Sequence, residues 1–377
     1  MTAPLAFIDL QAQRRRLGAP LERAILAAVE GGQWIMGPQV PELEEKLAAF
    51  SGVKHCITCA NGTDALMIVL RAWNIGPGDA VFVPAFTFAA SAEVVALVGA
   101  SPVFVDVRED TFNMDPASLD AAIAMTRMNG NLRPRAIMPV DLFGQPADYH
   151  AIEAIASREG LKILCDTAQG FGGSLNGRCT GSIGDAATTS FFPAKPLGCY
   201  GDGGAVFTSD DSLAELLRSI RIHGQGSDKY ENVRIGVNSR LDTIQAAILL
   251  EKLNIFPDEL EKREAVAQRY SQAFSRTNSI RVPRIMSTAR SSWAQYTIQV
   301  SDRDGLQTAL KEKGIPTAVY YPIPLSRQKG YRHFPSAPTP VSEALSKTVV
   351  SLPMHAYLDE PTQNRIIEAV ISTLDGA

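Results

Sequence analysis

The chain has 377 residues, of which 45% are hydrophobic and 20% charged, as in globular proteins long enough to form two cores. Its net charge of -4 and its scattered basic residues do not favour nucleic acid or an anionic membrane as a partner. Asp9 lies within the short apolar start of the chain, the reverse of a signal peptide, and Glu93 and Pro102 interrupt the apolar stretch 85–105. We therefore expect a cytoplasmic protein without a transmembrane helix.

The five cysteines are an odd number, which indicates free thiols rather than a disulfide framework. Cys56 and Cys59 form a CxxC pair, but His55 is the only further ligand type nearby, and a structural zinc ion needs four ligands. We therefore expect no metal site.

Helix and strand patterns alternate over residues 39–210. Amphipathic spacing predicts helices, and short apolar runs predict strands. The expected helices cover 38–52, 62–73, 116–125 and 148–160, and the expected strands cover 55–60, 80–84, 101–107, 135–142, 161–166 and 205–210. This order predicts an α/β fold with a mostly parallel sheet that is covered on both faces.

The pattern changes after a long helical region at 239–253 and 257–274. A strand over 293–300, a helix over 304–314 and a terminal helix after Leu358 follow it. We predict a large domain over 1–251 and a smaller C-terminal α/β domain over 252–377, hinged near 252–258. The first residues of the chain can pack with the smaller domain.

Unusual polar and aromatic residues follow four of the predicted strands, at 61–63, 86–88, 141–144 and 166–169. Ligand sites in parallel sheets lie at the carboxyl ends of the strands. The sequence therefore predicts one site at this edge of the sheet.

The turn at Gly62 and Thr63 is typical of an anion site, because the backbone N–H groups of a first helical turn attract phosphate. Ser190, five residues before Lys195, offers a hydroxyl to the same phosphate. The alternative is a capped helix without a ligand, since the segment lacks the spacing of a nucleotide-binding loop.

Asp166 ends an apolar strand, where its carboxylate could keep a heteroaromatic nitrogen protonated, or could simply cap a turn. Gln169 adds an amide donor three residues later. Phe88, like Phe86, either packs in the core or offers a ring for stacking.

Lys195 lies in the segment SFFPAKPLGCYGDGG, with no acidic residue closer than Asp202. Loss of hydration there lowers a lysine pKa and favours the neutral amine that captures a carbonyl. Alternatively, the stem crosses apolar surface and the head reaches water. Together, the lysine, the acid, the ring and the phosphate-binding turn are the parts of a pyridoxal phosphate site.

The chain resembles the DegT/DnrJ/EryC1/StrS family over essentially its whole length. The matching segments include FIDLQAQ, NGTDAL, DTAQGFGG, the Lys195 segment, GVNSRLDTIQAAIL and SLPMH, in the family's order. The family comprises pyridoxal-phosphate-dependent nucleotide-sugar aminotransferases with the fold-type I architecture of aspartate aminotransferase. The resemblance therefore implies this fold, pyridoxal 5'-phosphate as the cofactor, and a homodimer with shared active sites.

The resemblance also implies a role for each matched residue. Lys195 would hold the cofactor covalently and shuttle the proton, Asp166 would face the pyridine nitrogen, and Gln169 would lie near the phenolic oxygen. Asn238 would reach the cofactor phosphate of the neighbouring subunit. The remaining phosphate and ring contacts would come from Gly62, Thr63, Phe88 and Ser190.

The Lys195 segment, NSRLDTIQAAILLEKL and YPIPL are most similar to the UDP-2-acetamido-2-deoxy-3-oxo-glucuronate aminotransferase branch, which serves bacterial surface polysaccharides. Such a substrate carries a pyrophosphate and a carboxylate, for which Arg234 and Arg240 are the candidate cations. Tyr320, where relatives commonly have histidine, and Tyr321 could offer hydroxyls. Both arginines could instead form surface or structural ion pairs.

Three other functions compete with this assignment. The leading assignment has glutamate as the expected amino donor. The first competing function is amination of a dTDP- or GDP-linked 3-oxo or 4-oxo 6-deoxy sugar. The second is a sugar dehydratase of the same fold, but such relatives replace the lysine with histidine, so Lys195 favours transamination. The third is a regulatory protein that keeps the fold without catalysis.

Overall fold

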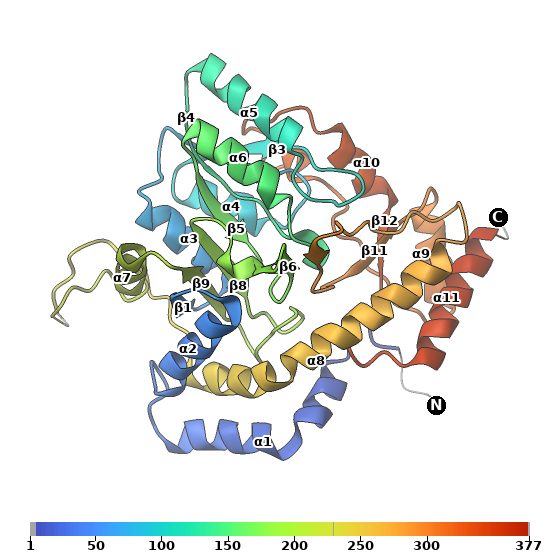
Figure 1. Cartoon of the computed structure of the whole chain (residues 1–377), viewed down its shortest axis with the longest axis horizontal. Helices are drawn as coiled ribbons and strands as arrows, with labels where there is room; N and C mark the ends of the chain where they lie inside the picture. Colours follow the sequence, from blue (N-terminus) through green and yellow to red (C-terminus); the bar gives the residue numbers. More distant parts are fainter. Residues whose placement is uncertain (1–4, 229, 376–377) are drawn as a thin grey trace.

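A computed structural model of the chain describes residues 5–228 and 230–375 (Figure 1). Its centre is a seven-stranded sheet in the order β1-β9-β8-β5-β4-β2-β3. The strands are β1 (His55–Cys59), β2 (Asp79–Pro84), β3 (Ser101–Val105), β4 (Arg133–Ile137), β5 (Lys162–Asp166), β8 (Ala186–Ser190) and β9 (Gly204–Thr208).

Among the strands of the described residues in this sheet, only β9 runs against its neighbours; it pairs antiparallel with both β1 and β8. The pairs β2–β3, β2–β4, β4–β5 and β5–β8 are parallel. The carboxyl ends of the other six strands therefore share one edge. The predicted α/β class with a mostly parallel sheet is confirmed.

Helices cover both faces of the sheet, as near-continuously buried strands require (Figure 1). One face packs against α2 (Gln39–Ser51), α5 (Pro116–Asn129) and α6 (Tyr149–Glu159). The other packs against α3 (Gly62–Ala72), α4 (Ala90–Leu97) and α7 (Asp211–Ile220). Acid or amide side chains cap several helices by accepting first-turn N–H bonds, namely Asn61, Asp115, Asp148 and Asp210.

The 32-residue helix α8 (Thr243–Phe274) connects two cores. Its first part, including Leu249 and Phe256, packs into the core of the sheet, and its last part, including Tyr270 and Phe274, packs into a separate core. Helix α1 (Leu10–Glu30), kinked at Gly18, lies along α8 (Figure 1).

The separate core belongs to the C-terminal part of the chain. It contains the antiparallel pair β11 (Tyr296–Gln299) and β12 (Val349–Leu352), with α9 (Arg303–Glu312) and α11 (Glu360–Asp375). Helix α10 (Pro340–Thr348) precedes β12. Near the start of the chain, the Phe7 carbonyl accepts a bond from the Met354 N–H. The boundary predicted at 251/252 falls inside α8, and the two-domain division stays a prediction.

Short elements complete the structure. Strands β6 (Ser174–Leu175), β7 (Arg178–Cys179) and β10 (Ala289–Arg290) form a small sheet, and 3-10 turns occur at η1 (Leu142–Gly144), η2 (Thr180–Ser182) and η3 (Leu325–Arg327). None of the helices in the described part of the chain is long and apolar enough to cross a membrane.

Candidate active site

A cavity of about 410 Å³ opens at the carboxyl edge of the sheet, where the sequence predicted a site. Loops and helix starts that follow β1, β2, β5 and β8 line it, together with residues from the C-terminal part. The predicted residues that line it are Gly62, Thr63, Phe88, Asp166, Gln169, Ser190, Lys195, Tyr320 and Tyr321.

The start of α3 forms one wall of the cavity. Asn61 caps the helix through a bond of 2.8 Å from the Asp64 N–H to its side-chain oxygen. Gly62 lies directly against Ser190, because a Cβ at Gly62 would stand 2.7 Å from the Ser190 Cβ. The close approach places the Ser190 hydroxyl beside the first turn of α3, where backbone N–H groups and the Thr63 hydroxyl are available to an anion.

Asp166 ends β5 and is 6% exposed. Its carboxylate accepts bonds from the Ser91 hydroxyl (3.0 Å) and from the Ala168 N–H (3.2 Å). Burial raises the pKa of Asp166, while the Ala168 N–H, the charge of Lys195 and the Ser91 hydroxyl all oppose the rise. The acid is thus rigidly held and faces the cavity with the lysine.

Lys195 lies on the loop of residues 191–203, here called the Lys195 loop, between β8 and β9. The loop is folded back on itself by bonds from the Lys195 N–H to the Phe192 carbonyl (2.8 Å) and from the Cys199 N–H to the Phe191 carbonyl (2.7 Å). Burial lowers the pKa of the Lys195 amine, although the charge of Asp166 counteracts this. A larger share of the amine is therefore neutral and nucleophilic than at a surface lysine.

Aromatic side chains frame the opening. Phe88 is 55% exposed although it is apolar, whereas its neighbour Phe86 is fully buried in a core. The rings of Phe88 and Tyr321 are 6.3 Å apart. The Gln169 amide donates to the Tyr321 hydroxyl (3.2 Å), and its oxygen accepts from the Phe143 N–H (2.8 Å). An exposed apolar ring beside a cavity is available for stacking.

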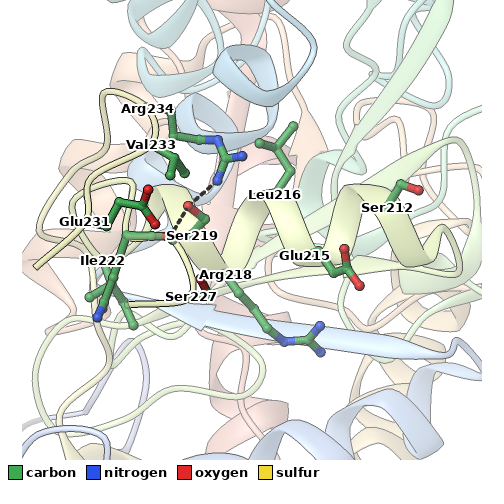
Figure 2. A pocket seen from close by; sticks show the side chains of 12 residues that line it. Ser212, Glu215, Leu216, Arg218, Ser219, Ile222, Ser227, Glu231, Val233 and Arg234 are labelled. Atoms are coloured by element: carbon green, nitrogen blue, oxygen red, sulfur yellow. Dashed lines mark hydrogen bonds between the residues drawn. The ribbon is translucent and has the colours of Figure 1, made fainter. Parts of the chain in front are cut away.

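Three predicted residues lie outside this cavity. Asn238 and Arg240 line a second cavity of about 450 Å³, which shares Asp202 with the first. Arg234 lines a surface pocket of about 800 Å³ between α7 and the loop that follows it, and its guanidinium donates to the Ser219 hydroxyl (Figure 2). The structure therefore does not bring these three residues to the Lys195 amine of the same chain.

Sequence reasoning missed several groups in the cavity. Ser91, the partner of Asp166, and Gln295, whose buried side-chain oxygen has no partner in the described part of the chain, were not singled out. Ser91 lies 75 residues from Asp166 in sequence. No local signal connects residues this distant.

Comparisons with known proteins identify the family of the chain. Residues 17–371 match the DegT/DnrJ/EryC1/StrS aminotransferase family. The chain is 49% identical over 355 residues to the UDP-2-acetamido-2-deoxy-3-oxo-D-glucuronate aminotransferase of Pseudomonas aeruginosa, covering 94% of this chain and 96% of that protein.

Two solved structures have the same fold. A DegT DnrJ EryC1 StrS aminotransferase from Brucella abortus is 54% identical, with a TM-score of 0.97 and coverage of 98% of this chain and 99% of that one. DesV from S. venezuelae, solved in complex with a ketimine intermediate, is 37% identical, with a TM-score of 0.93 and coverage of 98% of both chains. The chain therefore belongs to the DegT/DnrJ/EryC1/StrS aminotransferase family.

Proposed function

We propose that this chain aminates C3 of a UDP-linked 3-oxo-glucuronic acid derivative, with glutamate as amino donor, for surface polysaccharide such as lipopolysaccharide O-antigen. The observation that supports this substrate assignment is the 49% identity, over 94% of the chain, to a relative named for that reaction. Aminotransfer itself follows from family membership. The individual roles of the site residues below are part of the proposal.

The cavity fits pyridoxal phosphate, the cofactor of this family. The α3 start with Ser190 suits the phosphate, the carboxylate of Asp166 suits a protonated ring nitrogen, and the exposed Phe88 ring suits stacking. When bound, this cofactor supplies an aldehyde for an amine and a ring that withdraws electrons. Asp166 would favour that withdrawal by holding a proton on the ring nitrogen.

Lys195 has two tasks in this proposal. Its neutral amine would hold the cofactor, which the lowered pKa of the amine favours. The same nitrogen would also lie close enough to the reacting carbon to take a proton from one position and return it to another. Gln169, fixed at both ends by Phe143 and Tyr321, would donate to the phenolic oxygen of the ring.

Charge in the cavity supports a site shared between two subunits. Among the described residues that line it, Lys195 is the sole cation, beside the acids Asp166 and Asp202. A substrate with a pyrophosphate and a carboxylate needs further cations. Because Asn238 and Arg240 line the adjoining cavity, we propose that they, with Arg234, serve the site of a partner in a homodimer. Tyr320 and Tyr321 contact the sugar from within the chain.

The proposed location is the cytoplasm. All five cysteines are free thiols, as is usual in a reducing compartment.

A second candidate substrate is a dTDP- or GDP-linked 3-oxo or 4-oxo 6-deoxy sugar. Relatives named dTDP-3-amino-3,6-dideoxy-alpha-D-galactopyranose transaminase and GDP-perosamine synthase are each 38% identical to this chain. A non-catalytic role is a further competitor, since a relative named pleiotropic regulatory protein is 42% identical.

Two measurements test the proposal. Borohydride reduction of the purified, cofactor-loaded protein should label Lys195, as peptide mass analysis will show; a label on another lysine contradicts the site.

The ratio kcat/KM should be highest for the UDP-linked 3-oxo-uronic acid in a panel with its neutral counterpart and dTDP-linked 3-oxo and 4-oxo 6-deoxy sugars. If the enzyme prefers a 4-oxo sugar, or if the carboxylate makes no difference to kcat/KM, the proposed substrate is wrong. The assignment of aminotransfer is unaffected by either result. A colourless protein that takes up no cofactor favours the regulatory role.

Arg240 provides a sharper test of the carboxylate. If its guanidinium pairs with the sugar carboxylate, Arg240→Gln should cost about 2–4 kcal/mol in transition-state binding for the uronic acid and much less for the neutral sugar. If transition-state binding weakens equally for the two substrates, Arg240 does not pair with the carboxylate.

A further inference from the structure

Few contacts within the Lys195 loop fix the position of the Lys195 amine. The loop is neither helix nor strand, and its internal bonds join Phe191, Phe192 and Gly203 to residues of the same loop. Gly198 is folded so tightly that a Cβ there would stand 2.5 Å from the Phe192 carbonyl oxygen. Contacts from outside the loop must therefore decide where this compact unit lies relative to the cavity.

Apolar packing of Phe191, Leu197 and Cys199 in the core of the sheet supplies part of those contacts. Helix α8 adds directional polar contacts through Gln245 and Lys252. The Gln245 side chain pairs with both backbone polar groups of Tyr200: its oxygen accepts from the N–H (2.9 Å) and its amide donates to the carbonyl (3.4 Å). The Lys252 ammonium donates to the Gly198 carbonyl (2.6 Å) and lies 4.3 Å from the centre of the Tyr200 ring. Residues seven apart share one face of a helix, so both hold the loop from the same side.

Packing alone does not account for a lysine at position 252. Its side chain is 1% exposed, and taking an ammonium out of water is costly unless it is bonded. Burial lowers the pKa of Lys252 to about 8, while the charge of Glu259 opposes the fall. A methionine would fill the same volume without this cost. What a methionine lacks is the donor to the Gly198 carbonyl, three residues after Lys195.

We propose that Lys252, together with Gln245, is a positioning residue of the transamination reaction: by holding Gly198 and Tyr200 against α8, it sets where the Lys195 amine stands in the cavity. This inference rests on the proposed function only in taking Lys195 as the reactive amine. Neither residue lines the Lys195 cavity. Gln245 also lines the adjoining cavity with Asn238 and Arg240, so Lys252 is the residue that acts through the loop alone.

The experiment compares Lys252→Met with Lys262→Met in the full-length, cofactor-loaded protein. Lys262 is on the same helix but half exposed, where it pairs with Asp258 one turn earlier. In Lys252→Met, kcat should fall about 10- to 100-fold with both KM values changed less than about threefold, because a displaced amine affects chemistry rather than binding. Lys262→Met should keep wild-type kinetics.

Two further readouts separate positioning from a general loss of structure. The pH at which the absorbance of the bound cofactor changes should shift in Lys252→Met by at least about half a unit, since the surroundings of the amine change. In the cofactor-free protein, the extent of Lys195 methylation by formaldehyde and a borane should change at a fixed pH, as measured by mass spectrometry. Far-UV circular dichroism should stay that of the wild type.

The outcomes are distinct. The inference is wrong if Lys252→Met has the kcat, the absorbance titration and the extent of Lys195 methylation of the wild type. If that variant fails to fold, Gln245→Met decides by the same readouts, because it removes the bonds to Tyr200 and leaves the ammonium bonded. Borohydride labelling of the wild type keeps the two proposals apart: absence of label on Lys195 contradicts the proposed function, whereas a labelled lysine with unaltered variants contradicts only the positioning role.

Discussion

Gly62 is a residue whose lack of a side chain shapes the site. The first turn of α3 approaches Ser190 so closely that a single added carbon has no room. Because the obstructing atom is the Ser190 Cβ, which moves only with its backbone, the strain cannot be relieved by a side-chain rotation.

Gly62→Ala should therefore separate α3 from Ser190 and weaken the phosphate site between them. We expect the affinity of the cofactor-free protein for pyridoxal phosphate to fall about 10- to 100-fold, which corresponds to the 1–3 kcal/mol typical of overpacking. Absorbance titration measures the affinity. Gly330→Ala is the control, since a Cβ there meets no atom within 4 Å. Equal affinities in both variants would show that the phosphate lies elsewhere.

His355 follows β12 and is 5% exposed, and its Nδ1 has no hydrogen-bond partner in the described part of the chain. Burial lowers the pKa of the imidazole from 6.5 to about 4; Asp9 opposes the fall and Arg263 adds to it. The folded protein thus binds this proton less readily than the unfolded chain does. The stability that depends on a neutral His355 is complete above pH 6.5 and is lost as the pH falls toward 4.

Replacing His355 with glutamine should remove this part of the acid sensitivity. From pH 7.5 to pH 5, the wild type should lose about 2 kcal/mol more free energy of unfolding than His355→Gln, measured with urea. Asp141, whose pKa burial raises to about 7, titrates in both proteins and cancels in the difference. His333→Gln, at an exposed position, should behave as the wild type. A parallel loss in wild type and His355→Gln would contradict the neutral buried imidazole.

At the scale of elements, a buried ion pair joins α2, β1 and the end of α7. Arg221, 4% exposed, donates to a Glu44 carboxylate oxygen (2.5 Å) and to the Thr58 carbonyl (2.7 Å). The same carboxylate oxygen accepts from the N–H (2.9 Å) and the hydroxyl (2.8 Å) of Thr58. The pair thereby fixes β1 just ahead of the turn at Gly62.

Removing one partner should cost far more than removing both. Glu44→Leu leaves a buried guanidinium without its acid and should lower the free energy of unfolding by about 3–5 kcal/mol. The double variant Glu44→Leu/Arg221→Met should lose much less than the sum of the two single losses. Urea unfolding of all four proteins measures the coupling. Lys46→Ala, which breaks an exposed pair with Glu42 on the same helix, should cost less than about 0.5 kcal/mol. Additive losses would mean that the two charges are not coupled.

The elements also show which parts of the fold and the site can be predicted from the sequence. Strand ends at Gly62, Asp166 and Gln169 were predicted to meet, because parallel strands place their carboxyl ends at one edge. The unbroken α8 was not predicted, since Pro257 normally ends a helix. Apolar residues on both sides of it, Phe256 and Leu260, are buried in the core, and that burial outweighs the cost of the proline.

Contacts between distant segments were beyond local reasoning. The bonds of Ser91 to Asp166 and of Lys252 to the Lys195 loop join residues 75 and 54 positions apart. The partition of Asn238 and Arg240 into a second cavity likewise depends on packing that no motif encodes.

At the scale of the whole molecule, the segment of residues 230–237, which follows α7, carries apolar side chains outward. Val233 and Ile235 are 50% and 80% exposed. The segment projects from the body of the protein (Figure 1) and leads to Asn238. An exposed apolar projection next to a residue expected at a second cofactor site suits a shared dimer interface.

Mixing two inactive variants tests this arrangement. Lys195→Ala and Asn238→Ala, combined under conditions of subunit exchange, should recover about one quarter of wild-type activity, because half of the dimers are mixed and each has one intact site. Lys195→Ala mixed with Ser190→Ala is the control and should recover nothing, since both lesions lie in sites formed by their own chain. If the first mixture stays inactive despite demonstrated exchange, each site is built within one chain.

The order of strands in the sheet has a consequence for synthesis on the ribosome. Within the part of the chain that the structure describes, β1 pairs only with β9. In sequence, 145 positions separate Cys59 from Gly204, the nearest ends of the two strands. At the usual 5–20 residues per second, about 7–30 s pass between the translation of the first and the second. During that interval Cys56 and Cys59, inert once buried, belong to an unpaired edge strand that chaperones or oxidants can reach. The phosphate-binding turn that follows β1 can take its final place against Ser190 only after more than half of the chain has been made.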